Sequence, residues 1–121
     1  MKQGYLEITL LGQNVDSYGK DLKKHYSFAK LLDEVAKLKI PRLSFLTSHP
    51  YDFSLEIIDV MEKHKNIQPY LHLPLQSGDD KILKLMGRKY DSKKYLSIIK
   101  YAKKVMPNLS ISTDIIVGFP N

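Results

Sequence analysis

The sequence predicts an α/β fold in which parallel β/α units form part of an open, TIM-like barrel. Three observations lead to this prediction: strand-like and helix-like periods alternate along the chain, most strand segments have a polar face, and each strand runs into a polar cluster. Strands that alternate with helices must pair in parallel through crossovers. Polar clusters at the carboxyl ends of such strands are where barrel enzymes keep their chemistry. We therefore expect about half of a catalytic barrel.

Four segments are expected to be strands. Tyr5 to Leu11 and Leu71 to Gln76 alternate apolar and polar residues with a period of two, and the same period runs from Leu109 to Val117. Leu43 to Thr47 is a short strand for which no polar face is expected. The polar positions of the other three strands are Glu7, Thr9, His72, Gln76, Ser110, Ser112 and Asp114.

Four helices are expected between these strands. Ser27 is the expected N-cap of the first, whose apolar stripe is Phe28, Leu31, Leu32, Val35 and Leu38 and which ends at Ile40-Pro41. Ser54 introduces a helix that runs through Lys63. A short helix around Ile82, Leu83 and Met86 is terminated by Gly87. Asp91 caps the last helix, which carries Tyr95, Ile98, Ile99, Ala102 and Val105.

The polar strand face decides what kind of barrel this is. A doubly wound sheet is apolar on both faces, and an ordinary (β/α)₈ barrel fills its lumen with bulky branched side chains. The polar residues of these strands fit neither arrangement, so we expect helices on one face and a ligand-holding lumen on the other. Four strands also leave two exposed sheet edges, and we expect the chain to associate as a dimer or larger species through them.

Composition narrows the function classes. The chain has 121 residues, a single-domain length, and no cysteine, which excludes disulfides and thiolate-held zinc or iron–sulfur clusters within it. No apolar run approaches the roughly 18 residues of a membrane span, so a cytoplasmic setting is expected. The net charge of +6 suits a polyanionic partner such as RNA. Only Arg42 and Arg88 are arginines, and the lysines at 93, 94, 100, 103 and 104 are expected to form a solvated helix face.

Two function classes other than the main one are consistent with these residues. His49, His72 and Asp114 at the ends of separate strands could hold a divalent metal ion for hydrolysis, since imidazole and carboxylate are suitable ligands. Metal retained after purification would favour that class. A non-catalytic RNA-binding module would instead show RNA affinity without any cofactor site.

Four motifs in one register resemble the radical S-adenosylmethionine domain of the MiaB-type tRNA methylthiotransferases. They are LLGQNVDSYG from Leu10, TSHPYDF from Thr47, HLPLQSGDDKILKLMGRKY from His72 and STDIIVGFP from Ser112. Related enzymes that modify a ribosomal protein show an AQD-like first motif and a QH pair in the third. Gln13-Asn14 and Gln76-Ser77 therefore point to the tRNA branch.

The resemblance implies an enzyme that attaches a methylthio group to the isopentenylated adenosine next to the tRNA anticodon. Such enzymes use S-adenosylmethionine and a reduced 4Fe–4S cluster to form a 5′-deoxyadenosyl radical, and a second 4Fe–4S cluster is associated with sulfur insertion. The family's cluster-binding CxxxCxxC loop, its amino-terminal domain and its TRAM domain have no counterpart in residues 1–121. The resemblance thus implies a central fragment of the radical domain, inactive alone, with no catalytic residue and no metal ligand of its own.

The resemblance assigns cofactor contacts to the ends of two strands. Gly12, Gln13 and Asn14 would present neutral groups to the methionine end of S-adenosylmethionine, although Gly and Asn also suit an ordinary turn. Gln76 and Ser77 would bond its ribose or carboxylate. Ser77 is equally suited to cap the following helix.

The remaining assignments concern the last strand and the substrate. Asp114, the backbone of Ile116 and the flexible Gly118 would lie beside the adenine, although a buried aspartate bonded to neighbouring strands is a competing interpretation. His49 would face the tRNA, or satisfy local backbone groups. Arg88 would meet phosphate, against the alternative of a solvated surface position.

Overall fold

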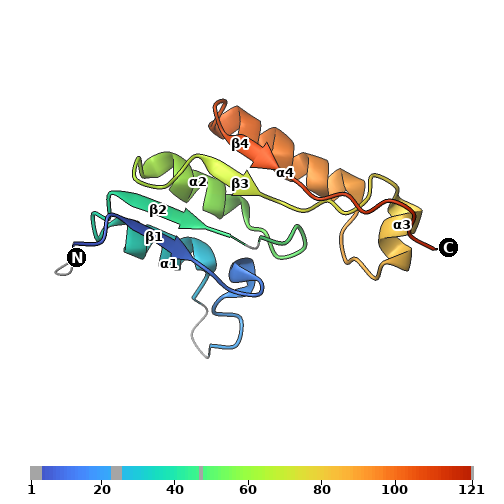
Figure 1. Ribbon diagram of the computed structural model, residues 1–121, viewed down its shortest axis with the longest axis horizontal. Coiled ribbons are helices and arrows are strands. Elements are labelled where there is room, and N and C mark those ends of the chain that lie inside the picture. The colour runs from blue at the N-terminus through green and yellow to red at the C-terminus, as the bar shows by residue number, and fades with distance from the viewer. Residues whose placement is uncertain (1–3, 23–25, 47, 121) are drawn as a thin grey trace.

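The computed structural model describes residues 4–22, 26–46 and 48–120 and places the strands in one layer, with the longer helices behind it (Figure 1). Thr47, the expected last residue of one strand, lies outside the described residues. In chain order the elements are β1 (Glu7–Leu10), the 3₁₀ helix η1 (Val15–Ser17), α1 (Phe28–Ala36), β2 (Arg42–Phe45), α2 (Leu55–Lys63), β3 (Tyr70–His72), α3 (Asp80–Leu85), α4 (Ser92–Val105) and β4 (Ser110–Ser112).

All pairing among these strands is parallel. β1 pairs with β2 and β3 pairs with β4, and a parallel bridge between Leu43 and Ile67 links the two pairs. The strands therefore follow chain order across the layer. This confirms the α/β class with short parallel strands and one helix-containing crossover between each strand and the next.

The core lies between the strands and the helices that cover one of their faces. Leu43 and Leu71 from the strands are buried against Leu32, Ile58 and Ile98 from α1, α2 and α4. Burial of such side chains supplies the main stabilisation, about 1.5 to 3 kcal/mol for each. The helices thus fix the apolar face and leave the other face of the strands open.

The open face is polar, and its side chains bond across the strands. Thr9 Oγ1 lies 2.8 Å from Ser44 Oγ, and the Tyr70 hydroxyl lies 2.6 Å from Ser112 Oγ. The expectation that the Leu43–Thr47 strand has no polar face was wrong, because this strand begins at Arg42 and turns Arg42 and Ser44 to the open side. A polar face on every strand strengthens the case for a ligand-holding side.

Three strands are shorter than the sequence predicted, and β1 spans only Glu7–Leu10 of the expected Tyr5 to Leu11. β3 ends at His72 rather than Gln76, and β4 ends at Ser112 rather than Val117. Pro74 has no N–H to donate to the ladder, and the Leu75 N–H is instead accepted by the Thr113 hydroxyl at 2.8 Å. Pairing resumes only as a single parallel bridge between Gln76 and Ile115.

The helix N-caps follow the prediction. Ser27, Ser54 and Asp91 each accept a hydrogen bond from a backbone N–H in the first turn of the helix that follows. The predicted apolar stripe of the first helix was wrong at Leu38, which is exposed because α1 ends at Ala36.

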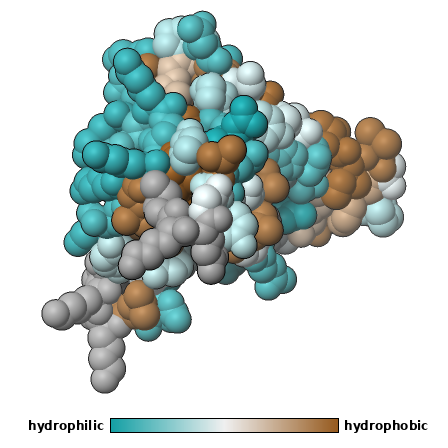
Figure 2. Space-filling model, turned by 60° about the vertical axis from the view of Figure 1, so that its left-hand side comes forward, coloured by the Kyte–Doolittle hydropathy of each residue, from teal (hydrophilic) through white to brown (hydrophobic). Residues whose placement is uncertain are grey.

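Apolar side chains also reach the surface, and Figure 2 shows them gathered on the right-hand side of its view among hydrophilic ones. Two exposed groups flank β1 and follow β4: Tyr5, Leu6 and Leu11 beside β1, and Ile115, Ile116 and Val117 after β4. Among the described residues, no helix has the length and apolar character needed to cross a membrane.

Asn66 ties the end of α1 to the start of β3. Its side-chain amide donates to the Ala36 carbonyl at 3.0 Å and to the Ile40 carbonyl at 2.9 Å. We predict that Asn66→Ala lowers the free energy of unfolding by about 1 to 3 kcal/mol, because both bonds are lost. Urea unfolding of the chain measures this, with exposed Asn108→Ala as the control, expected to change stability by less than about 0.5 kcal/mol. Equal effects of the two substitutions would contradict the role of Asn66.

Candidate functional site

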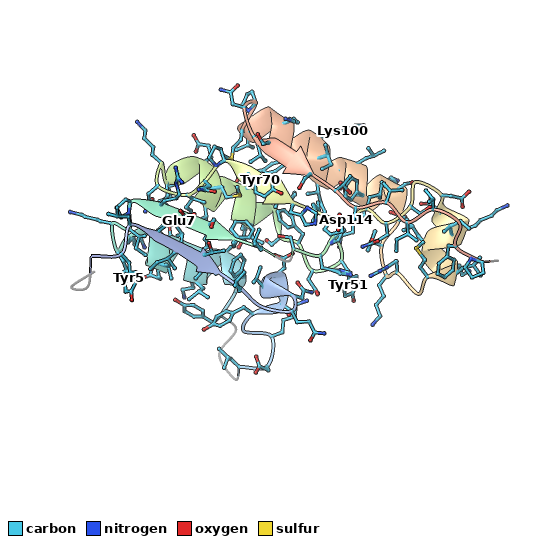
Figure 3. The ribbon with its side chains drawn as sticks, viewed as in Figure 1. Tyr5, Glu7, Tyr51, Tyr70, Lys100 and Asp114 are labelled. Atoms are coloured by element: carbon cyan, nitrogen blue, oxygen red, sulfur yellow. The ribbon has the colours of Figure 1, made fainter. Side chains whose placement is uncertain are left out.

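Parallel pairing brings the carboxyl ends of all four strands to one edge of the layer. The segments that meet there are residues 11–14, 48–52, 73–78 and 113–118, and every predicted site residue except Arg88 lies in one of them. Figure 3 shows Tyr51 and Asp114 toward this edge and Tyr5 and Glu7 toward the opposite one. This edge is the candidate site.

The first two strand-end segments are tied together by Asn14. Its Nδ2 donates to Asp52 Oδ2 at 2.6 Å, and its Oδ1 accepts from the Asp16 N–H at 3.2 Å, which caps η1. Lys20 forms an ion pair with the same Asp52. The Asn14 side chain therefore positions the loop, while Gly12 and Gln13 before it are exposed.

Asp16 is a buried carboxyl between the same two segments. Its Oδ2 accepts from the His49 N–H at 2.7 Å, whereas its Oδ1 has no hydrogen-bond partner among the described residues. Burial raises the pKa of Asp16 to about 7, against the His49 N–H that favours the charged form. The negative charge of Asp52 raises the pKa of Asp16 further, because it repels a charged Asp16 carboxylate. Asp16 thus changes charge near neutral pH.

The His49 side chain is half-buried and contacts other residues of the protein. Its Nδ1 accepts from the Tyr51 N–H at 3.3 Å, and its ring packs edge-on against Tyr90 with centroids 5.5 Å apart. Burial and the nearby Arg88 guanidinium lower the pKa of His49. Arg88 itself is half-buried, and its Nε is a buried atom without a hydrogen-bond partner among the described residues.

Gln76 adopts a backbone conformation that is rare for its residue type. Its φ is +73°, in the left-handed region that favours glycine, and such conformations cost about 1 to 3 kcal/mol. The Gln76 N–H donates to the Asp114 carbonyl, and its carbonyl accepts from the Ile116 N–H, each at 2.8 Å. Pairing on both sides to the segment after β4 fixes this conformation.

Ser77 and Gly118 follow two of these strand ends. Ser77 is buried and its Oγ accepts from the Asp79 N–H at 3.1 Å, while Asp79 caps α3 by accepting from Lys81 and Ile82. Gly118 has a φ of +69°, so a side chain at this position would be strained. Ile116 beside it is exposed.

A line of hydrogen bonds crosses the open face just before this edge. His72 Nδ1 lies 2.7 Å from Ser112 Oγ, and His72 Nε2 lies 3.2 Å from Asp114 Oδ2. His49 does not join them, and the described part of the chain contains no group of three or more His, Asp or Glu that could hold a metal ion. The metal-hydrolase hypothesis based on His49, His72 and Asp114 therefore loses its support.

A cavity of about 500 Å³ lies between β1, η1 and α1. Gly12 and Asn14 line it together with apolar side chains such as Leu10, Phe28 and Leu31. No lining residue comes from the ends of β2, β3 or β4. We therefore place the candidate site at the shared strand edge rather than in this cavity.

Sequence reasoning missed four side chains that organise the edge: Asp16, Tyr51, Asp52 and Tyr90. The signal was present, because Asp16 lies in the LLGQNVDSYG motif and Tyr51 and Asp52 lie in TSHPYDF. Their contacts depend on the packing of loops far apart in the chain, which a single sequence does not display.

The buried Asp16 carboxyl makes stability depend on pH. Its folded pKa of about 7 exceeds the ordinary value of 3.8, so the folded state binds the proton more tightly, and the stabilisation present below pH 4 is lost as pH rises to 7. Asn at position 16 keeps an acceptor for His49 without the charge. We predict that Asp16→Asn gains stability relative to the unsubstituted chain between pH 4 and pH 8, by about 4 kcal/mol at most. Urea unfolding across this range measures the difference, and a difference that does not vary with pH would contradict the burial argument.

Comparison with known proteins shows the family of this chain. A family model described as "Radical SAM superfamily" matches residues 1–121. Proteins named tRNA-2-methylthio-N(6)-dimethylallyladenosine synthase are similar along 99% of the chain: that of Staphylococcus haemolyticus is 53% identical, that of Staphylococcus epidermidis 51% and that of Staphylococcus aureus 53%. The chain spans about a quarter of the length of these relatives, 24% of each. Since the family model covers the whole chain, the chain belongs to the radical SAM superfamily.

Proposed function

We propose that this chain is the central part of the catalytic domain of a tRNA methylthiotransferase that acts on an isopentenylated adenosine next to the anticodon. The observation that carries the proposal is the unbroken similarity, 51% to 53% identity over 99% of the chain, to enzymes named for this reaction. A cytoplasmic location follows from such a substrate. The whole barrel would be completed by segments outside residues 1–121.

The strand ends fit one end of S-adenosylmethionine by their chemistry. Gln13 and Gln76 offer neutral amide donors and acceptors, and backbone pairing holds Gln76 in a strained conformation. Asp114, the Ile116 backbone and Gly118 would lie along the rest of the cofactor. Gly12, Asn14 and Ser77 would act by shaping the loops that hold these groups.

Cluster ligation would come from outside this chain. Residues 1–121 contain no cysteine, so neither of the two proposed 4Fe–4S clusters would be held by the residues described above. The clusters would supply the reducing chemistry when bound. The residues of this chain would bind and orient the cofactor and the nucleoside.

The tRNA branch is favoured over the ribosomal-protein branch and over another tRNA adenosine. The relatives carry the name of the dimethylallyladenosine enzyme, and the chain has Gln13-Asn14 and Gln76-Ser77 at the two discriminating motifs. His49 and Arg88 are proposed to act on the substrate side. His49 lies in the second strand-end segment, and Arg88 lies in the loop between α3 and α4, close enough to lower the pKa of His49.

The complete reading frame around this chain tests the proposed reaction. Expressed in cells that lack the methylthio modification, it should restore methylthio-isopentenyladenosine, measured by mass spectrometry of digested tRNA. Modification of a ribosomal protein, with the tRNA unchanged, would contradict the proposal.

Gln76 provides a residue-level test in the complete protein. We predict that Gln76→Ala lowers the rate of S-adenosylmethionine cleavage by about tenfold with cluster content intact, because it removes a hydrogen bond to the cofactor and touches no iron ligand. Gln76→Gly is the matched variant, since glycine keeps a φ of +73° without strain. Both should be impaired alike, while Gln68→Ala, before β3, should behave as the parent. Unimpaired cleavage by Gln76→Gly would assign Gln76 to structure.

We also propose that residues 1–121, taken alone, self-associate as a dimer or larger species. The edge of β1 that does not pair with β2 and the exposed apolar segment at 115–117 would form contacts between copies of the chain when no other part of the barrel covers them. Sedimentation over a range of concentrations should show a rise in mass. A chain that stays monomeric at high concentration would contradict this proposal.

A further inference from the structure

Three lysine side chains converge on one exposed tyrosine at the carboxyl edge. The ammonium nitrogens of Lys20, Lys89 and Lys94 lie 5.8, 5.7 and 5.4 Å from the centre of the Tyr51 ring. They come from three segments: the loop after η1, the loop between α3 and α4, and the first turn of α4. Tyr51 itself is 45% exposed, and Figure 3 shows it toward this edge. We call these four residues the Tyr51 cluster.

The cluster is more ordered than a set of solvated lysines. Lys94, which the sequence placed on a solvated helix face, is half-buried, and its Nζ donates to the Tyr51 carbonyl at 2.8 Å. Lys20 is paired with Asp52. Lysine over an aromatic ring gains a cation–π attraction that helps to hold like charges together.

The local charge balance remains positive. Asp52 faces the cluster from the β2 loop and neutralises one ammonium group. Asp91 caps α4 by accepting from the Lys94 N–H, so its charge is directed to the helix backbone. The guanidinium of Arg88 lies close enough to depress the pKa of neighbouring His49. Several ammonium groups beside the Tyr51 ring form a site that can bind an anion carrying a planar group.

We propose that the Tyr51 cluster binds a phosphate of the RNA backbone, with the adjacent base against the Tyr51 ring. This inference rests on the proposed function, because it takes a tRNA as the partner. Lysine binds phosphate as a point charge, and tyrosine offers both a hydroxyl donor and a stacking face that accepts any base. The cluster lies on the same edge as the proposed cofactor contacts, so it would hold the RNA close to the reacting nucleoside. Lys20, Lys89 and Lys94 are thus positioning residues.

The test compares two triple variants of the complete, cluster-loaded protein. Lys20→Gln, Lys89→Gln and Lys94→Gln together remove the cluster's ammonium groups. Lys65→Gln, Lys100→Gln and Lys104→Gln remove the same charge from exposed positions away from the carboxyl edge. Binding of unmodified tRNA is measured at several salt concentrations.

The cluster variant should bind tRNA at least about tenfold more weakly, with a salt slope lower by about 1, since one phosphate contact is lost. The control should change the slope by less than about 0.5. Because Lys20 also pairs with Asp52, the double variant Lys89→Gln and Lys94→Gln is measured as well, and its slope should fall by about 1. Equal losses in the two triple variants would overturn the proposal.

Two further readouts separate this proposal from the function on which it rests. Cleavage of S-adenosylmethionine without tRNA should be unchanged in the double variant Lys89→Gln and Lys94→Gln, because neither residue belongs to the proposed cofactor contacts. If the parent protein modifies tRNA but both triple variants bind it equally well, the cluster proposal alone is wrong. If the parent modifies no tRNA, the proposed function itself fails. Binding of polyglutamate as tightly as RNA, with the same lysine dependence, would overturn the RNA assignment in favour of an acidic peptide.

Discussion

Parallel pairing with helices on one face only is the constraint on which the rest of this structure depends. Since the strands run the same way, their carboxyl ends meet at one edge, and loops from distant parts of the sequence become neighbours. Because Leu43 and Leu71 face the helices, the alternate residues must face the open side. The polar face and the candidate site are therefore consequences of one arrangement.

Two kinds of contact hold the edge in shape. Between the first two loops, the carboxylates of Asp16 and Asp52 receive donors from His49, Asn14 and Lys20. Between β3 and β4, backbone bonds hold Gln76 in its left-handed conformation. The first kind of contact includes the Asp16 carboxyl, whose charge changes near neutral pH, whereas the second is independent of charge.

Local chemistry explains why part of the fold was predictable. Ser27, Ser54 and Asp91 cap the expected helices. A short polar side chain just before a helical apolar pattern favours this role, because its oxygen can accept a hydrogen bond from an N–H of the first turn. The polar strand face was also predicted, apart from Arg42 and Ser44. Pro74 indicates that β3 should end early, but the alternation of apolar and polar residues favoured a longer strand.

The rest depends on contacts between distant segments. A glutamine gives no sign of a positive φ, so the conformation of Gln76 required the pairing with Asp114 and Ile116 to be seen. The burial of Asp16 depends on the loop that carries His49, and the lysines around Tyr51 come from three separate segments. The motifs marked the segments that meet at the carboxyl edge, and the structure supplied the contacts between them.

The central claim is that the shared carboxyl edge of the strands, and not the apolar cavity between β1 and α1, receives the cofactor. Amide hydrogen exchange of the complete protein, with and without S-adenosylmethionine, tests it most directly. The account predicts slower exchange on cofactor addition in residues 12–14, 75–78 and 113–118, with no change at 104–108 on the opposite edge. Protection confined to the cavity lining at 17–22 and 28–31, with the strand ends unchanged, would contradict it.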